Sequence, residues 1–252
     1  MTRNGFDMPS ATQPKQLRYY ERKTWKENSN MQLNFKRIID LSYPIDENSP
    51  CELPIEPARI YDTATMEEDG YFESRVDLSG HYSTHTDTPS LMYASGFTID
   101  QIPLEKLSGM VTLMNFSRDK KPGDEITEQE ITNWMAEHDD IAKDSIVFLY
   151  TGMQEYAYQP IFNRKWIGLS GEAAKLLCDK GIKIVGTDAP SIDSLRGHDI
   201  QFPAHHTFLE HEIPIVEDIC NLDKLPQNFY ALIAPLKLCK SSGAPTRVFA
   251  FV

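Results

Sequence analysis

The sequence predicts a mixed α/β domain rather than a regular doubly wound one. Apolar and alternating stretches typical of strands outnumber the helical patterns, and the two clearest helical patterns each lie between strand patterns. A chain of 252 residues is expected to form one large domain, because α/β domains often reach this size. Such a chain can also bury enough surface to fold without disulfides or a structural metal.

The expected elements begin after a polar leader. Residues 1–34 show no clear hydrophobic period, and we interpret them as an N-terminal extension that is poorly ordered or lies at an oligomer interface. The domain itself is expected over residues 35–252. Its strand patterns lie at residues 37–41, 71–78, 109–116, 145–150, 182–185, 213–216, 230–233 and 248–252.

Two helices are predicted from their capping residues. Thr127 and Glu130 have the spacing of a capping box, and apolar residues follow from Ile131 on one helical face. Ser170 precedes an apolar pattern over residues 171–180, and Gly181 is a typical helix stop. Both helices therefore have a start signal, and the second also has an end signal.

Charge and composition exclude several functional classes. With 37 acidic and 25 basic residues, the formal net charge is −12, which argues against general nucleic-acid binding. No apolar run approaches the length needed to cross a membrane, and the first 30 residues lack the apolar core of a signal peptide. The four cysteines are widely spaced, so reduced thiols and a cytoplasmic location are expected.

A first histidine cluster contains His81, His85 and Asp87. All three are at odd-numbered positions, so an extended chain would point them to one face. A fully extended chain would place positions 81 and 87 about 20 Å apart, too far to share one ion, so the chain is expected to bend here. Gly80 and Pro89 supply residues that allow such a bend. Two imidazoles and one carboxylate suit Zn, Mn or Fe, and a hydrogen-bonded turn without metal is the alternative.

A second cluster contains His205, His206, His211 and Glu217, and its pattern is weaker. Either of the first two histidines could begin a helix, and His211 could be solvated. Glu217 follows a strongly apolar run, where a carboxylate is costly unless it is paired or binds a metal. His198 is interpreted as a loop residue that could edge a pocket.

The residues around both clusters resemble those of the cyclase-type metal-dependent hydrolases, the family that includes bacterial kynurenine formamidase and isatin hydrolase. The family fingerprint, His-x-Gly-Thr-His-x-Asp-x-Pro-x-His, corresponds to HYSTHTDTPSL at residues 81–91. His205 and Glu217 are twelve positions apart (217 − 205), as in the second metal pair of the family. The likeness continues at residues 40–45 (DLSYPI), 96–104 (GFTIDQIPL), 166–170 (WIGLS), 186–193 (GTDAPSID), 214–219 (PIVEDI) and 242–247 (SGAPTR).

This resemblance implies a fold, a metal site and an activity. It implies a single domain with a curved mixed sheet and flanking helices, assembled as a homodimer or homotetramer. Ligands at one metal position would be His81, His85 and Asp87; Asp87, His205 and Glu217 would serve a second. The implied cofactor is one or two ions of zinc or manganese. The implied activity is hydrolysis of a small amide, formamide, lactam or lactone by metal-activated water. From charge and composition, no nucleic-acid or membrane partner is expected.

Three positions depart from the family pattern. Leu91 replaces the last histidine of the fingerprint, which is the proton shuttle of the family, and an isobutyl group cannot move protons. Ser83 replaces the fingerprint glycine, a mild change if the backbone keeps a negative φ. The aromatic residue of the family's early Pro-x-Trp-Pro region is missing from residues 50–54.

The replacement at Leu91 leaves three functional hypotheses open. In the first, the hydrolase works and His206, Glu217 or Tyr93 handles the proton. In the second, the protein is a ligand-binding or regulatory pseudoenzyme that retains the fold. In the third, the same metal supports a lyase or cyclase reaction through a stabilised enolate.

Overall fold

An eight-stranded mixed sheet forms the centre of the molecule, which we describe from a computed structural model covering residues 34–52, 54–138 and 140–252. The strand order is β1 (Ile38–Asp40), β12 (Gly243–Phe251), β11 (Asn228–Pro235), β5 (Ser108–Asn115), β7 (Ile146–Tyr150), β9 (Ile184–Thr187), β10 (Ile215–Glu217) and β4 (His85–Asp87). The parallel part of the sheet runs through β5, β7, β9 and β10, and antiparallel strands flank it.

The sheet closes on itself at β4. This strand pairs antiparallel with β10 on one side and with β12 on the other, so the sheet closes between β4 and β12 and β1 lies outside the closed part. Residues 35–252 form one compact unit, and the predicted mixed α/β fold with a curved sheet is confirmed. The extension predicted at residues 1–34 lies outside the described residues, apart from Asn34.

Apolar residues pack on both faces of this sheet, as the sequence of β7 illustrates. Its residues alternate, because successive side chains of a strand point to opposite faces. Ile146, Phe148 and Tyr150 belong to one buried cluster, with residues of β5, β11 and β12. Val147 and Leu149 belong to the other, which the helices cover. The closed sheet therefore has its own core and a second core beneath the helices.

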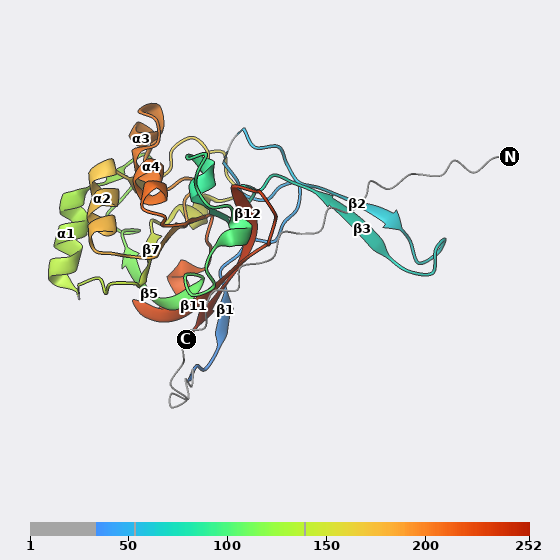
Figure 1. Ribbon diagram of the computed structural model, residues 1–252, viewed down its shortest axis with the longest axis horizontal. Helices are drawn as coiled ribbons and strands as arrows, with labels where there is room; N and C mark the ends of the chain where they lie inside the picture. Colours follow the sequence, from blue (N-terminus) through green and yellow to red (C-terminus); the bar gives the residue numbers. More distant parts are fainter. Residues whose placement is uncertain (1–33, 53, 139) are drawn as a thin grey trace. The chain divides into compact units, whose positions relative to one another are not determined.

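Three helices lie together on one side of the sheet (Figure 1): α1 (Glu128–Glu137), α2 (Gly171–Asp179) and α4 (Pro203–Glu210). The predicted capping box is present, since the Thr127 hydroxyl accepts from the Glu130 amide and the Glu130 carboxylate accepts from the Thr127 amide. The Ser170 hydroxyl likewise accepts from the Ala173 amide at the start of α2. Among the described residues, no helix combines the length and apolar character needed to cross a membrane.

The remaining elements are short. A fourth helix, α3 (Leu195–Asp199), begins after Ser194, whose hydroxyl accepts from the Gly197 amide. The interpretation of His198 as a loop residue is therefore wrong. It lies in a helix of five residues, which is too short to show a hydrophobic period in the sequence. The other short elements are β6 (Glu125–Ile126), β8 (Gly168–Leu169), and the 3₁₀ turns η1 (Pro89–Leu91), η2 (Ile99–Gln101), η3 (Met153–Tyr156) and η4 (Leu222–Lys224).

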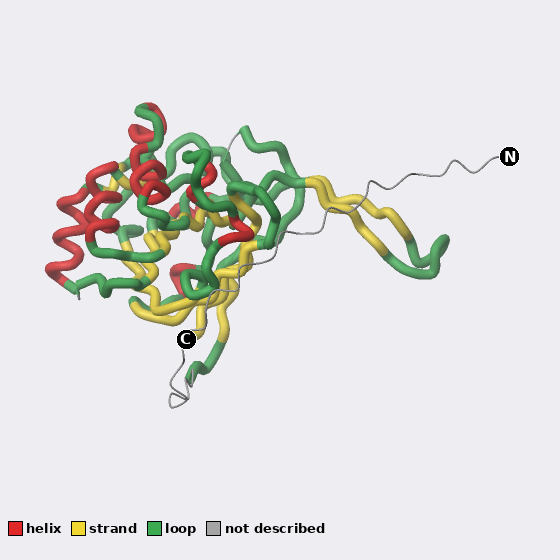
Figure 2. Tube along the Cα trace, viewed as in Figure 1, coloured by secondary structure: helices red, strands yellow, loops and turns green. Residues whose placement is uncertain are grey.

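A two-stranded hairpin of β2 (Arg59–Ala64) and β3 (Glu73–Asp77) extends from the rest of this unit (Figure 2). Within the described residues its strands pair only with each other. Nearly all of its side chains are exposed, including the apolar ones on both strands. Its exposed large apolar residues are Ile60, Tyr61, Met66, Tyr71, Phe72 and Val76.

Candidate metal centre

Two paired strands carry three of the five predicted ligands. β4 and β10 run antiparallel with Glu217 directly opposite His85 and Ile215 opposite Asp87. His85 and Asp87 are two residues apart on one strand, so both side chains point to the same face, as their parity predicts. Cross-strand neighbours have Cβ atoms about 5 Å apart, which brings the Glu217 carboxylate to these two side chains.

His81 reaches the same place because the chain bends before β4. The bend passes through Ser83, whose φ of 56° lies in the left-handed region. The condition for a mild change, a negative φ at this serine, is therefore not met: the turn has the conformation that favours glycine, which costs a serine about 1 kcal/mol. Gly243 leaves space for the bend, since a Cβ there would lie 2.5 Å from the His81 ring.

Hydrogen bonds fix the His81 ring on both sides. Its Nδ1 lies 2.6 Å from Asp87 Oδ1, and its Nε2 lies 2.8 Å from the Ser242 hydroxyl. The ring is partly exposed, in contrast to the other four members of the cluster. His81 therefore forms the outer edge of the group.

His205 comes from the first turn of α4, and Asp193 holds its ring. Asp193 accepts from His205 Nδ1 at 2.7 Å, from the His205 amide at 3.0 Å and from the Ala204 amide at 2.7 Å. A carboxylate on Nδ1 fixes the tautomer and leaves Nε2 for a metal. Sequence reasoning assigned Asp193 no role, although an acidic residue shortly before a ligand-bearing helix was a usable signal.

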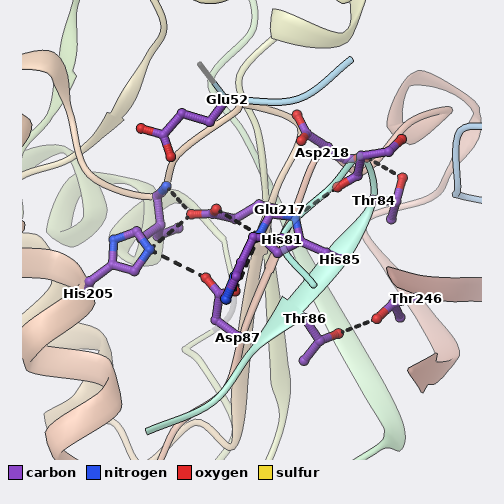
Figure 3. Close-up of polar contacts among 12 residues, drawn as sticks. Glu52, His81, Thr84, His85, Thr86, Asp87, His205, Glu217, Asp218 and Thr246 are labelled. Carbon is purple, nitrogen blue, oxygen red and sulfur yellow. Dashed lines mark hydrogen bonds and ion pairs between the residues drawn. The ribbon is translucent and has the colours of Figure 1, made fainter. Parts of the chain in front are cut away.

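The five side chains converge with spacings that suit an ion (Figure 3). His85 Nε2 lies 3.2 Å from Asp87 Oδ1 and 3.4 Å from Glu217 Oε2; His205 Nε2 lies 3.5 Å from Asp87 Oδ2 and 3.4 Å from Glu217 Oε1. Ligand atoms about 2.1 Å from an ion at a tetrahedral angle lie about 3.4 Å apart. The residues present therefore fit a divalent metal.

Asp87 is shared by two such groups. One consists of His81, His85 and Asp87, and the other of Asp87, His205 and Glu217. Its Oδ1 faces the first group and its Oδ2 faces His205. This arrangement allows the carboxylate to bridge two ions.

Burial and mutual charge set the protonation of the metal-free cluster. Burial opposes a charge on His85, but Asp87 and Glu217 outweigh it and raise the pKa of His85 to about 10. Burial would raise the pKa of Asp87, yet His85 and His81 hold it well below its ordinary value. Burial raises the pKa of Glu217 to about 8, against the attraction of His205. The metal-free cluster therefore holds protons that a bound cation would displace.

Asp218 adds a buried carboxylate that sequence reasoning missed. It follows Glu217 directly, and neither of its oxygens has a hydrogen-bond partner among the described residues. Burial raises its pKa well above the ordinary value, and the Glu217 charge adds to the effect.

The three candidate bases occupy different places. The Glu217 carboxylate is inside the cluster and accepts from the Ile192 amide at 2.7 Å. Tyr93 and His206 lie outside it and contact each other, with the phenol oxygen 3.1 Å from His206 Nδ1. His211 is exposed and stands at the C-terminal cap of α4. Its Nδ1 lies 2.7 Å from the Thr207 carbonyl oxygen. The structure thus brings neither His206 nor His211 into the ligand cluster.

Leu91 lies in η1, half-buried, and packs against the apolar cluster beneath the helices. Its side chain packs among apolar residues of that cluster and carries no polar atom. The departure from the fingerprint is therefore accommodated by packing.

The chain matches known proteins over most of its length. The family model described as "Putative cyclase" matches residues 39–194. A kynurenine formamidase of Bacillus cereus is 27% identical over 212 residues, covering 83% of this chain and 94% of that protein. Isatin hydrolase A from Labrenzia aggregata, solved with benzyl benzoate, superposes with a TM-score of 0.80 at 26% identity, covering 86% of this chain and 93% of that one.

A further solved structure is described as a potential metal-dependent hydrolase with cyclase activity. It superposes with a TM-score of 0.69 at 29% identity, covering 85% of this chain and 97% of that one. The resemblance stated from the fingerprint is confirmed: this chain belongs to the cyclase family of metal-dependent hydrolases.

Proposed function

We propose that this protein is a metal-dependent hydrolase of small amides, with formamides, lactams and lactones as the substrate classes to test. The observation that carries the proposal is the convergence of three imidazoles and two carboxylates at ligand spacing in a buried site. The related kynurenine formamidase and isatin hydrolase are hydrolases by name, and they cover most of the chain.

The ligands proposed are His81, His85, Asp87, His205 and Glu217. A divalent ion held there supplies positive charge that polarises a carbonyl and acidifies water. The chain's own contribution is orientation: Asp193 holds the His205 ring, and the Ser83 carbonyl oxygen lies 2.8 Å from His85 Nδ1, so each ring presents Nε2 to the cluster. Because these groups are buried, their positions are set before substrate arrives.

We propose zinc or manganese as the metal, in one or two ions. Imidazole and carboxylate donors suit both metals, and no cysteine among the described residues belongs to the cluster. The two faces of Asp87 support a second ion. Elemental analysis of the purified protein measures identity and stoichiometry together.

A homo-oligomer in the cytoplasm is proposed as the working state. The exposed apolar side chains of the β2–β3 hairpin support assembly, since an isolated two-stranded hairpin is marginally stable in water. The four cysteines are unpaired, which supports a reducing compartment. Light scattering of the wild-type protein and of a variant lacking residues 59–77 measures the contribution of the hairpin.

Turnover of a defined substrate panel tests the activity. The wild-type protein, stripped by a chelator and reloaded with zinc or manganese, is offered N-formyl aryl amines, isatin-like lactams and lactones. We expect metal-dependent hydrolysis of at least one class, with one oxygen of H₂¹⁸O incorporated into the product. Turnover without ¹⁸O would indicate a lyase or cyclase, and a fully loaded protein that converts none of them would indicate a ligand-binding role.

A further inference from the structure

Hydrolysis requires a group that moves protons. Four positions are considered first for this role: Leu91, Glu217, Tyr93 and His206. Leu91 has no titratable atom. Glu217 lies among the ligands, and its carboxylate accepts from the Ile192 amide. His206, which Tyr93 contacts at 3.1 Å, belongs to neither ligand group. Another titratable group at the edge of the site is therefore the next candidate to carry the proton.

Glu52 and His198 form a pair at that edge, which we call the rim pair. Glu52 lies in the loop before β2, and His198 lies in α3. His198 Nε2 is 2.6 Å from Glu52 Oε1, and the two side chains are 32% and 26% exposed. The pair therefore combines a short hydrogen bond with access to solvent, which a proton carrier needs to exchange with water.

An aromatic wall connects the rim pair to the ligand cluster. The His198 ring meets the Phe202 ring edge-on with centroids 4.3 Å apart, and Phe202 meets the His205 ring at 5.9 Å. Phe202 adopts a φ of 58°, a left-handed conformation that costs a bulky residue about 1 kcal/mol or more. Strain of this kind persists where the surroundings fix the residue, so Phe202 holds a defined place between the two histidines.

Helix α3 is also locked to the residue that orients His205. A Cβ at Gly197 would lie 2.9 Å from Asp193 Oδ1, so only a glycine allows this approach. The neighbouring His198 is thereby held at a fixed place relative to the Asp193–His205 hydrogen bond.

The Glu52 carboxylate lies within electrostatic reach of the site. Burial is the main cause of the raised pKa of Glu217 and of Asp218, and the Glu52 charge raises both further. Figure 3 shows the Glu52 side chain near His205 and Glu217, at the edge of the cluster. Glu52 lies in the segment 50–54, which lacks the aromatic residue of the family pattern.

We propose that Glu52 is the proton-transfer residue of this enzyme and that His198 is its positioning residue, an inference that rests on the proposed hydrolase function. As the water oxygen bonds to the carbonyl carbon, Glu52 accepts the proton that the water loses. When the C–N bond breaks, that proton passes to the departing nitrogen, so the products are a carboxylic acid and an amine. His198 binds Oε1 and leaves Oε2 for the transfer.

Charge-neutral substitutions test the two roles. We expect Glu52→Gln to lower kcat about 100-fold with KM within about twofold, the scale typical of a lost general acid–base group. Glu52→Asp retains an intermediate rate, and added acetate partly restores Glu52→Ala. His198→Gln lowers kcat about tenfold and alters the pH profile, because Glu52 loses its partner. The matched control is Glu56→Gln on the same loop, whose side chain is 88% exposed; it leaves kcat unchanged.

Two readouts are independent of turnover. Metal content and metal affinity should be unchanged in Glu52→Gln, because Glu52 is not among the ligands. The ¹⁵N shifts of the His198 ring should change in Glu52→Gln and not in Glu56→Gln, reporting loss of the 2.6 Å hydrogen bond. Burial raises the pKa of Cys51, Glu217 and Asp218, and the Glu52 charge raises it further. His198 and His205 also lie near Glu52, so the pH–rate profile is compared between Glu52→Gln and wild type at full metal loading.

The outcomes separate this inference from the proposed function. Metal-dependent turnover by the wild type that persists in Glu52→Gln overturns the role of Glu52 alone. A raised KM at unchanged kcat also overturns it, by assigning Glu52 to substrate binding. A lower melting temperature at unchanged kcat makes the rim pair a structural contact only. Wild-type protein without any metal-dependent turnover overturns both the function and the inference.

Discussion

The ligand cluster and the rim pair differ in their exposure and in the elements that carry their residues. Four of the five cluster side chains are no more than 6% exposed, and they come from paired strands and the first turn of a helix. The rim pair is 26–32% exposed and comes from a loop and a helix of five residues. Strand pairing fixes the register of the cluster residues on β4 and β10, whereas loops allow the rim to change without disturbing the sheet.

The departures from the family fingerprint follow this division. The cluster retains every family ligand type, while Leu91 and the segment 50–54 differ, and Glu52 of that segment belongs to the rim pair. Ser83 is the exception, since it lies in the bend that brings His81 to Asp87 and tolerates a φ of 56°. The candidate ligands therefore keep the family pattern, whereas the position of the family's proton shuttle does not.

Replacing the shared carboxylate should have the largest effect. Asp87→Ala removes contacts to His81, His85 and His205 at once. It leaves His81 without its carboxylate partner, while His85 and His205 keep only Glu217 within the cluster. We expect loss of bound metal and loss of turnover, measured by elemental analysis and activity; His85→Ala should behave alike. Asp77→Ala, on the exposed strand β3, is the matched control and should keep full occupancy. Full occupancy in both cluster variants would refute the ligand assignment.

Lowering the pH should weaken metal binding by the next largest amount. In the metal-free protein the pKa of His85 is raised to about 10, because Asp87 and Glu217 outweigh its burial, so the imidazole is protonated at pH 7. Burial opposes the charge on His205 as well, but Glu217 and Asp193 raise its pKa well above the ordinary value. Binding must release these protons, so affinity rises with pH, by about tenfold per pH unit for each proton released.

Calorimetry in buffers of different ionisation enthalpy counts the released protons, and chelator competition at pH 6, 7 and 8 measures the affinity. Proton release of at least one per ion is expected. An affinity that does not change over this range would contradict the protonation assigned to the cluster.

Removing the support behind His205 should have an intermediate effect. Asp193→Asn keeps the shape of the side chain and weakens the bond to His205 Nδ1, which is 2.7 Å long. Changes of this kind typically cost about 10–100-fold in metal affinity. The expected pattern is weaker binding at the position of His205 and Glu217, with near-normal binding at the position of His81 and His85. Equal weakening at both positions would show that Asp87 couples them.

Much of the ligand cluster could be predicted from the sequence, because it depends on short local patterns. The parity of His85 and Asp87 placed both on one face, and the apolar run before Glu217 predicted a buried strand end. The pairing of Glu217 with His85 was not predictable from pattern alone, since it joins strands 132 residues apart (217 − 85). Family resemblance supplied that link.

The rest depended on contacts between distant segments. Glu52 and His198 are 146 positions apart in the sequence, and the residues around either one do not predict its contact with the other. Strand β2 escaped prediction because its residues are exposed on both faces and have no consistent alternation. Strand β9 was expected at 182–185 and lies at Ile184–Thr187, because the apolar run begins in the preceding turn.

Restoring the fingerprint histidine should have the smallest effect, and its size depends on the rim. Leu91→His replaces a half-buried side chain that packs on the helix-side core, so a loss of about 1 kcal/mol in the free energy of unfolding is expected. If Glu52 carries the proton, Leu91→His changes kcat less than tenfold in the wild-type background. In the Glu52→Gln background the same substitution should recover much of the lost rate, because a second base becomes available. Steady-state kinetics of the four combinations measure this coupling. A large gain from Leu91→His alone would instead mean that the rim pair moves no proton and that the replacement at position 91 impaired an older mechanism.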